Sequence, residues 1–200
     1  MSGAHRLAVT VTMVLAAMTP AASTGKLSIV PGEGEVRFLM ETTWHEVIGV
    51  TREVIGTIES AGADPFKDGL VRVSIDAASL DTGNKRRNET MRREYLETDR
   101  YPTIEFASTG PPAIVSTVTG AGGKYTEVSL ELTGDLTIHG ETRRIRLPVV
   151  VTPEGAAWKV EGQLAVLLSD HAIPDPSLFV NRVKDEVTVS FSVKARIPAE

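Results

Sequence analysis

The chain has 200 residues, a hydrophobic share of 42% and a formal net charge of −5 at pH 7, which is typical of a single globular domain with a sizeable core. The acidic balance argues against nucleic acid as the main partner, because no global positive field is present to attract phosphates. Cysteine is absent, and this excludes disulfide scaffolds, thiol catalysis and Cys-based zinc sites.

The first 23 residues have the pattern of a secretory signal peptide. His5 and Arg6 precede an uncharged run over residues 7–18, and Ala21 and Ser23 fit the small-residue positions of a cleavage site. The run is shorter than the roughly 20 residues that a membrane-spanning helix needs, so a signal is favoured over an anchor. We therefore expect the mature chain, residues 24–200, to be one domain that is periplasmic or secreted.

From residue 25 onward, short runs of alternating apolar and polar residues dominate the chain. Such alternation places each apolar set on one face of a β-strand and the polar set on the other. Repeated along most of the chain, it predicts an antiparallel sheet with a single buried side. The clearest runs cover residues 35–41, 71–75, 130–133, 144–149 and 187–194.

Turn signals separate these runs at hairpin spacing. They are Asp68-Gly69, Gly122-Gly123, His139-Gly140 and Glu154-Gly155. The last two connections are short and predict consecutive strands paired as a meander. A sheet of about eight strands would leave exposed edges unless it closed or stacked. We therefore predict an all-β fold, an eight-stranded antiparallel barrel, with a two-sheet sandwich as the alternative.

One segment, residues 84–97, breaks the β pattern and is rich in helix formers, without Gly or Pro. Asn84 is a suitable N-cap, and Met91 and Tyr95 lie four residues apart on one helix face. Pro102 follows and disfavours further helix. The segment predicts one helix near the barrel mouth, where it would act as a lid or plug.

Catalytic signatures such as G-x-S-x-G, H-E-x-x-H or a P-loop are absent. His45, His139 and His171 stand far apart in the sequence, and His139 precedes a glycine in a tight turn, where a polar residue is expected for backbone reasons. Asp170 and His171 are adjacent, but neighbours in a strand face opposite ways. We predict no catalytic residues, no metal and no cofactor. A small hydrolase-like enzyme using Asp170 and His171 stays as an alternative.

The predicted helix carries a basic cluster made of Lys85, Arg86, Arg87, Arg92 and Arg93. Interleaved glutamates favour a solvated helix face with local ion pairs. The alternative is a cationic rim that meets a phosphate or a polar headgroup at the barrel mouth, in which Arg87 and Arg92 would be the rim residues.

Several segments, in order along the chain, resemble those of the YceI family and together cover roughly residues 34–196. The segment at 80–92 contains the turn D-T-G-N, and the one at 96–106 contains Y-P-T-I-E-F. The hairpin L-T-G-D-L-T-I-H-G-E-T occupies 132–142. An early hairpin at 44–56 and a closing strand at 183–195 are also similar to family segments.

The resemblance implies a lipocalin-like, eight-stranded barrel with a helix near its opening, in periplasmic or secreted proteins that bind long isoprenoid or fatty amide chains, often as dimers. It implies no catalytic residue. Mapped onto this chain, it makes nine apolar positions candidate lipid contacts, although each can equally be plain core packing. They are Phe38, Val73, Ile75, Met91, Tyr95, Phe106, Leu136, Ile138 and Phe191.

The resulting hypothesis is non-catalytic binding and carriage or sequestration of a long-chain lipid inside the barrel, with the helix gating the mouth. A homodimer and a transient contact with a membrane are further expectations. The main alternative is an interaction module with a packed barrel that partners a membrane redox or stress-response protein.

One segment departs from the family pattern. Many family members carry R-x-D-F-G-I where this chain has L-S-D-H-A-I at 168–173. The shape of this loop and the identity of the ligand are therefore left open by the resemblance.

Overall fold

Strands account for most of the computed structural model, which describes residues 25–62, 64–177 and 181–197. The predicted signal peptide lies outside the described residues. In chain order the strands are β1 Gly25–Ile29, β2 Glu35–Thr42, β3 Glu46–Thr51, β4 Val54–Ser60, β5 Leu70–Asp76, β6 Thr103–Ser108, β7 Ala113–Thr119, β8 Tyr125–Ile138, β9 Glu141–Glu154, β10 Ala157–Leu167 and β11 Val183–Arg196.

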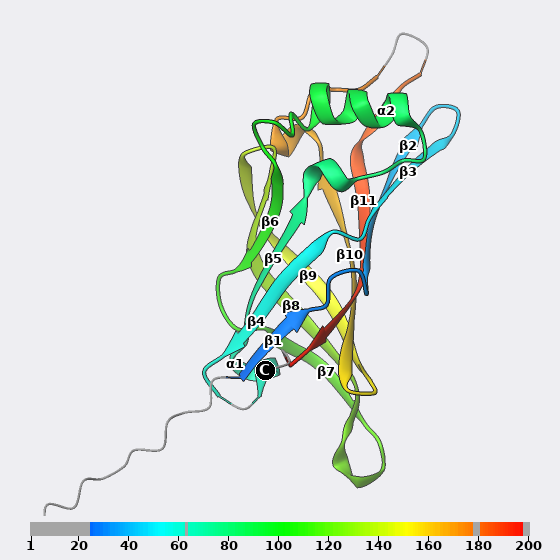
Figure 1. Ribbon diagram of the computed structural model, residues 1–200. Coiled ribbons are helices and arrows are strands. Elements are labelled where there is room, and N and C mark those ends of the chain that lie inside the picture. The colour runs from blue at the N-terminus through cyan, green and yellow to red at the C-terminus, as the bar shows by residue number, and fades with distance from the viewer. Residues whose placement is uncertain (1–24, 63, 178–180, 198–200) are drawn as a thin grey trace, which may run out of the picture.

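Hydrogen bonding closes these segments into a barrel with eight wall positions (Figure 1). The order β1-β4-β5-β6-β8-β9-β10-β11 returns to its start, because β1 also pairs with β11 through Ser28 and Arg196. Strand β2 pairs with β11 further along and with β3, while β7 pairs with β8 beyond β6. All of these pairings are antiparallel. The predicted eight-stranded antiparallel barrel is therefore confirmed.

Three of the four predicted turns lie where the sequence predicts them, whereas Asp68-Gly69 follows the short helix Pro65–Asp68 and is not a tight hairpin turn. His139 and Gly140 connect β8 to β9 with φ values of 51° and 77°, and two successive positive φ values are the mark of a type I′ hairpin turn. Gly155, at φ 63°, turns β9 into β10, and Gly122 and Gly123 turn β7 into β8 with φ values of 80° and 72°. Each glycine adopts this left-handed region at little steric cost.

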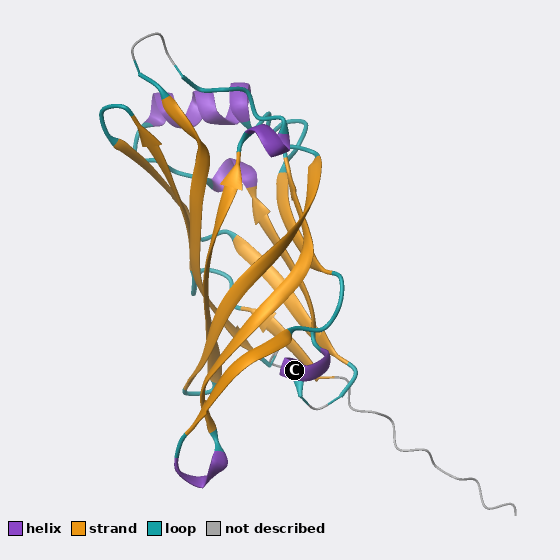
Figure 2. Cartoon of the chain, turned by 180° about the vertical axis from the view of Figure 1, so that it is seen from behind, coloured by secondary structure: helices purple, strands orange, loops and turns teal. Residues whose placement is uncertain are grey.

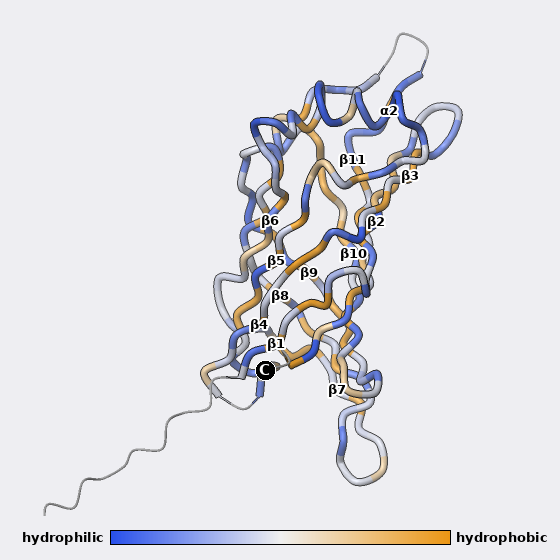
Figure 3. The backbone as a smooth tube through the Cα atoms, in the orientation of Figure 1, coloured by the Kyte–Doolittle hydropathy of each residue, from blue (hydrophilic) through white to orange (hydrophobic). Residues whose placement is uncertain are grey.

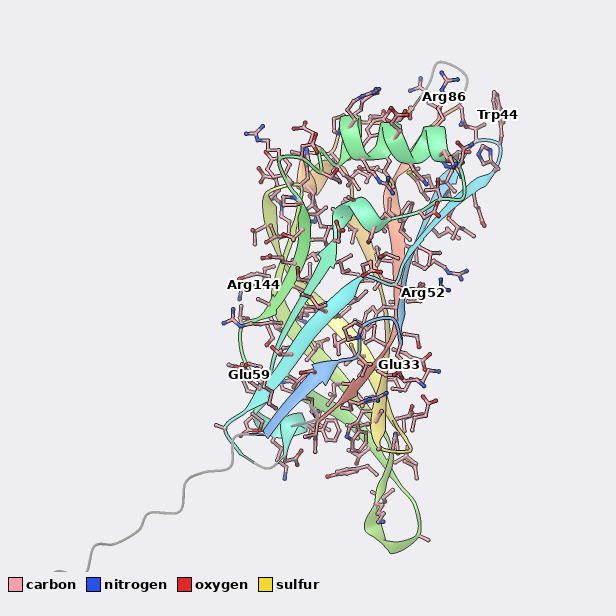
Figure 4. All side chains as sticks on the ribbon, in the orientation of Figure 1. Glu33, Trp44, Arg52, Glu59, Arg86 and Arg144 are labelled. Carbon is pink, nitrogen blue, oxygen red and sulfur yellow. The ribbon has the colours of Figure 1, made fainter. Side chains whose placement is uncertain are left out.

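Alternation along the strands separates the interior from the exterior. In β8, every second residue from Val128 to Ile138 is buried, Gly134 included, while the residues between them are exposed or half-buried. The tube coloured by hydropathy shows the same alternation along the barrel wall (Figure 3). Charged side chains project away from the wall, as Arg52 and Arg144 do in Figure 4.

The predicted helix is confirmed and crosses one end of the barrel (Figures 1 and 2). It consists of α2, Lys85–Thr90, continued by a π-helical turn, η2, Met91–Tyr95. The side chain of Asn84 caps it by accepting a hydrogen bond from the Arg87 N–H at 3.1 Å, as predicted. The short helices are α1 Pro65–Asp68, η1 Ala77–Ser79, η3 Ala121–Gly123 and η4 Ser169–His171.

The opposite end of the barrel carries α1 and the long hairpin formed by β7 and the start of β8 (Figure 1). We refer to these as the α2 end and the α1 end. Among the residues that the structure describes, no helix combines the length and the apolar character needed to cross a membrane.

Candidate binding site in the barrel lumen

An apolar cavity of about 220 Å³ occupies the barrel interior. Its wall extends from Leu80 and Ile138, near α2, to Phe66 and Trp158 at the α1 end. Among the described residues that line it, none has a charged or carboxamide side chain, and the only polar side-chain atom is the indole nitrogen of Trp158. A site of this kind can hold a hydrocarbon chain, but it offers no group that could orient or activate a polar substrate.

Seven of the nine candidate lipid contacts line this lumen: Phe38, Val73, Ile75, Phe106, Leu136, Ile138 and Phe191. The two candidates on the helix do not line it. Tyr95 instead packs, partly buried, against the core cluster that contains Ile173, and Met91 is half-buried. The physical reason is that strands build most of the wall, whereas this helix lies across its end. Contact between any of these residues and a lipid stays a prediction.

The inward-facing side chains retain accessible surface, which a close-packed core would not allow. Several of them are only partly buried although they pack against the buried cluster of Ile29, Val54 and Val193. The accessible surface belongs to the lumen, because the same side chains line the cavity. They are Val36, Val73, Ile75, Val160 and Phe191.

Three phenylalanines of the wall lie against glycines of a neighbouring strand. A Cβ atom added at Gly49 would lie 2.1 Å from Phe38 Cε1, and one added at Gly162 would lie 2.5 Å from Phe191 Cζ. Phe106 lies over Gly134 in the same way, at 2.5 Å. A ring this close to a neighbouring backbone lies along the wall and not across the lumen. Phenylalanine covering a strand glycine is also a recognised way to stabilise such a glycine.

The sequence pattern did not predict these phenylalanine–glycine pairs of the lumen wall. The available signal was a glycine inside an otherwise regular strand pattern, which often marks a close approach of another group. Its partner could not be identified, because the pairs Phe38–Gly49 and Phe191–Gly162 follow from strand register. The width of the lumen therefore depends on these glycines, as well as on the inward-facing apolar residues that the alternating pattern predicts.

At the α2 end, polar contacts hold a loop, residues 80–83, in place, and Leu80 of this loop lines the lumen. Asp81 forms two backbone hydrogen bonds of 2.9 Å with Val50 of β3. The buried amide of Asn88 accepts from the Thr82 N–H at 2.9 Å and from the Thr82 hydroxyl at 2.6 Å, and it donates to Asp81 Oδ1 at 2.7 Å. Because a buried polar group is costly to leave unpaired, this network fixes the loop to the helix.

The two predicted rim arginines take part in the same network. Arg87 donates to the hydroxyl and the carbonyl oxygen of Thr82, both at 2.8 Å. Arg92 donates to the carbonyl oxygen of Leu80 at 3.3 Å. Both arginines therefore stabilise the loop at 80–83. Contact between either of them and a lipid headgroup stays a prediction.

Acid should weaken this network. Hydrogen bonds from the Asn88 amide and the Gly83 N–H lower the pKa of Asp81 below its ordinary value of 3.8. A depressed folded-state pKa means that the charged form stabilises the folded protein above the unfolded pKa, and that this contribution is lost as pH falls through the folded value. We expect the free energy of unfolding at neutral pH to be higher for the wild type than for Asp81→Asn. This difference in unfolding free energy should shrink below about pH 4. Urea unfolding across this pH range measures it, and a gap independent of pH would contradict the assignment.

The structure brings together two histidines that the sequence left apart. His139 Nδ1 lies 3.1 Å from the carbonyl oxygen of His171, and His171 Nδ1 lies 2.9 Å from the carbonyl oxygen of Glu141. Carbonyl oxygens only accept, so both Nδ1 atoms carry the proton. His139 Nε2 faces Glu97 Oε1 at 3.5 Å. This cluster joins the β8–β9 turn to the end of the helix, away from the lumen wall.

The adjacent acid and imidazole of Asp170 and His171 do not form a dyad. Both lie in η4, where His171 is 2% exposed and Asp170 is exposed. His45 lies near the β2–β3 turn and is exposed. No group of three or more His, Cys, Asp or Glu side chains that could hold a metal ion is found within residues 25–62, 64–177 and 181–197.

The segment 168–173, where the chain departs from the family pattern, folds as η4 followed by Ala172 in the left-handed region, at φ 50° and ψ 26°. This is the position at which the family pattern has glycine. Left-handed backbone costs a residue with a Cβ about 1–2 kcal/mol. The chain therefore keeps the loop conformation that glycine favours without having the glycine.

We expect Ala172→Gly to raise the free energy of unfolding by about 0.5–1 kcal/mol, since relief of left-handed strain exceeds the entropy that glycine adds to the unfolded chain. Urea denaturation measures the change. The matched control is Ala113→Gly on β7, an exposed strand position, where the same substitution should destabilise. Equal losses in both variants would show that Ala172 is not strained.

A closed antiparallel barrel around an apolar lumen defines this protein as a lipocalin-type barrel. The YceI-like domain model matches residues 27–195, and the chain belongs to this family. It is 36% identical over 86 residues to UPF0312 protein plu2095 of Photorhabdus laumondii, covering 42% of this chain and 38% of that protein. It is 28% identical over 125 residues to Protein YceI of Shigella flexneri, covering 58% and 59%. The chain thus matches less than two thirds of the length of each of these relatives.

Solved structures show the same barrel. BcnA of Burkholderia cenocepacia matches with a TM-score of 0.65 and 25% identity, over 83% of this chain and 98% of that chain. A polyisoprenoid-binding domain from Saccharophagus degradans, implicated in plant cell wall breakdown, matches with a TM-score of 0.67 and 18% identity, over 86% and 98%.

Proposed function

We propose that this protein binds a single long-chain lipid, an isoprenoid or a fatty amide, in the lumen of the barrel and carries or sequesters it without chemical change. The observation that carries the proposal is the continuous apolar wall of a cavity that spans the barrel. The polyisoprenoid-binding neighbour from Saccharophagus degradans supports the ligand class.

The size of the lumen favours a slim ligand. Its volume of about 220 Å³ is below the ~300–1,000 Å³ usual for drug-sized ligands. One extended chain suits such a lumen better than a fused-ring lipid does. Burying ten methylene-sized groups gains about 8 kcal/mol, from which the cost of immobilising the ligand must be subtracted.

A non-catalytic role agrees with the chemistry of the wall. Catalysis on a bound lipid would need a nucleophile or an acid–base group within reach of the lumen, and no wall residue other than Trp158 has a polar side-chain atom. His171, the imidazole of the hydrolase-like alternative, is buried and donates to the Glu141 carbonyl. We propose that the protein works in the periplasm or outside the cell, where it would carry an apolar lipid through an aqueous compartment.

Native mass spectrometry of protein purified from its own host without detergent tests the proposal. We expect an adduct of several hundred daltons that organic extraction removes and that added polyprenol or fatty amide restores. A bare protein mass, together with no uptake of either lipid, would contradict the proposal and favour a packed interaction module.

Adjacent residues of β9 offer a matched pair for locating the ligand. Val149 is buried and lines the lumen, whereas Val150 is 37% exposed on the outer face. Threonine has nearly the same shape as valine but places a hydroxyl on the wall, which opposes contact with a hydrocarbon. Val149→Thr should weaken polyprenol binding and Val150→Thr should not. Equal affinities in the two variants would place the lipid elsewhere.

A further inference from the structure

Three aromatic side chains pack together at the α1 end of the lumen. The ring of Phe66, in α1, packs edge-to-face on Trp158 with centroids 5.2 Å apart and on Tyr125 with centroids 6.1 Å apart. Phe66 and Trp158 line the lumen, whereas Tyr125 is 37% exposed. Phe66 therefore has the lumen on one side and the outer end of the β7–β8 hairpin on the other.

The two ends of the barrel are held by different kinds of contact. At the α1 end, the polar contacts of α1 are local: the Phe66 N–H donates to Asp64 Oδ1 at 3.1 Å, and Asp68 accepts from the Ser60 hydroxyl. At the α2 end, a backbone bridge and the Asn88 network join segments distant in sequence. Moving the Phe66 side chain disrupts aromatic and apolar packing but no side-chain hydrogen bond, while opening the α2 end leaves the buried amide of Asn88 unpaired.

The surface around Phe66 is unusually apolar. Every residue of β7 is exposed, and β7 is hydrogen-bonded to β8 alone. Leu70, Ile114, Val115, Val118 and Tyr125 are all large apolar residues with 37–68% of their surface exposed. We call these five residues the apolar fringe. Large apolar side chains exposed together mark interaction sites in soluble proteins, and one of these five, Tyr125, contacts Phe66 of the lumen wall.

We propose that the lipid enters and leaves the lumen at the α1 end, past Phe66, directly from a lipid bilayer that docks on the apolar fringe. The inference rests on the proposed lipid-binding function and names its route and its partner. It replaces the expected gate at the helix with one at the opposite end. A lipid tail that passes from the bilayer to Tyr125, Phe66 and the lumen stays out of water along the way.

A reversible disulfide cross-link at the α2 end tests the entry route of the lipid. Val50 and Asp81 form a hydrogen-bonded antiparallel bridge, in which Cα atoms are about 5.5 Å apart, a distance that a disulfide can span. The chain has no other cysteine, so the double variant Val50→Cys/Asp81→Cys forms one defined cross-link. We expect its oxidised and reduced forms to take up polyprenol from phosphatidylcholine vesicles at equal rates. A block that appears on oxidation and is relieved by reduction would overturn the route.

Phe66→Ala tests the gate. We expect the rate constants for both uptake and release of polyprenol to rise at least tenfold. The matched control is Trp44→Ala, which removes an aromatic ring that is 66% exposed at the α2 end (Figure 4) and should leave both rates unchanged. Slower transfer in Trp44→Ala, with wild-type rates in Phe66→Ala, would show that the lipid passes at the α2 end.

Docking is tested by the double variant Val115→Asp/Val118→Asp on β7. It should slow transfer from vesicles at least tenfold and leave binding of cyclodextrin-solubilised polyprenol unchanged. If it instead converts a dimer to a monomer in light scattering and leaves vesicle transfer intact, a second copy of this chain covers the fringe and the docking proposal is wrong. If the wild type takes up no lipid from either source, the proposed function itself fails.

Discussion

Replacing Gly49 by alanine is expected to remove most of the lipid binding that we propose for this barrel. The new Cβ would lie 2.1–2.9 Å from three atoms of the Phe38 ring, a separation that carbon atoms do not tolerate. The ring must leave the wall, and because Phe38 faces inward, it moves into the lumen. We expect polyprenol affinity to fall at least tenfold and unfolding free energy to fall by about 1–3 kcal/mol, as is usual for overpacking. A fluorescent polyprenol titration and urea denaturation measure the two effects.

The double variant Phe38→Leu/Gly49→Ala separates a blocked lumen from a misfolded strand. Leucine removes the ring that clashes, so binding should recover to near the level of Phe38→Leu alone. Gly110→Ala is the matched control, because a Cβ there meets no atom within 4 Å, and it should bind as the wild type does. Failure of the double variant to recover would show that Gly49 serves the strand and not the lumen.

Filling the lumen is expected to produce the largest change in thermal stability. An empty apolar cavity of about 220 Å³ costs the folded state about 5 kcal/mol at ~24 cal/mol per Å³. A ligand that restores the missing contacts should recover much of this and raise Tm by up to about 10–20 °C for a chain of this length. Calorimetry of delipidated and polyprenol-loaded protein measures the difference.

A series of isoprenoid alcohols of increasing length provides the control for that experiment. A five-carbon alcohol fills little of the lumen and should shift Tm slightly, while longer chains should shift it progressively until the wall is covered. Equal Tm values for delipidated and loaded protein would contradict binding inside the barrel. A shift that does not depend on chain length would place the lipid on the surface.

The sequence by itself determined the strand pattern, the tight turns and the class of fold. Alternation with a period of two is a local property, as is the preference of glycine for positive φ in the turns around residues 140 and 155. The helix was predictable for the same reason, since Asn84 caps it through a contact with Arg87, three residues away. The inward face of each strand followed from alternation, and seven of the candidate contacts lie on the lumen wall.

Only the tertiary structure decided how wide the lumen is and how its two ends are closed. The phenylalanine–glycine pairs depend on register between strands, which local pattern does not specify. The helix candidates Met91 and Tyr95 were expected at the wall, yet the helix lies across the end of the barrel, because β3 and the loop at 80–83 hold it there through the Val50–Asp81 bridge. Phe66 meets Trp158 and Tyr125 only because closure of the barrel brings α1, β8 and β10 to one end.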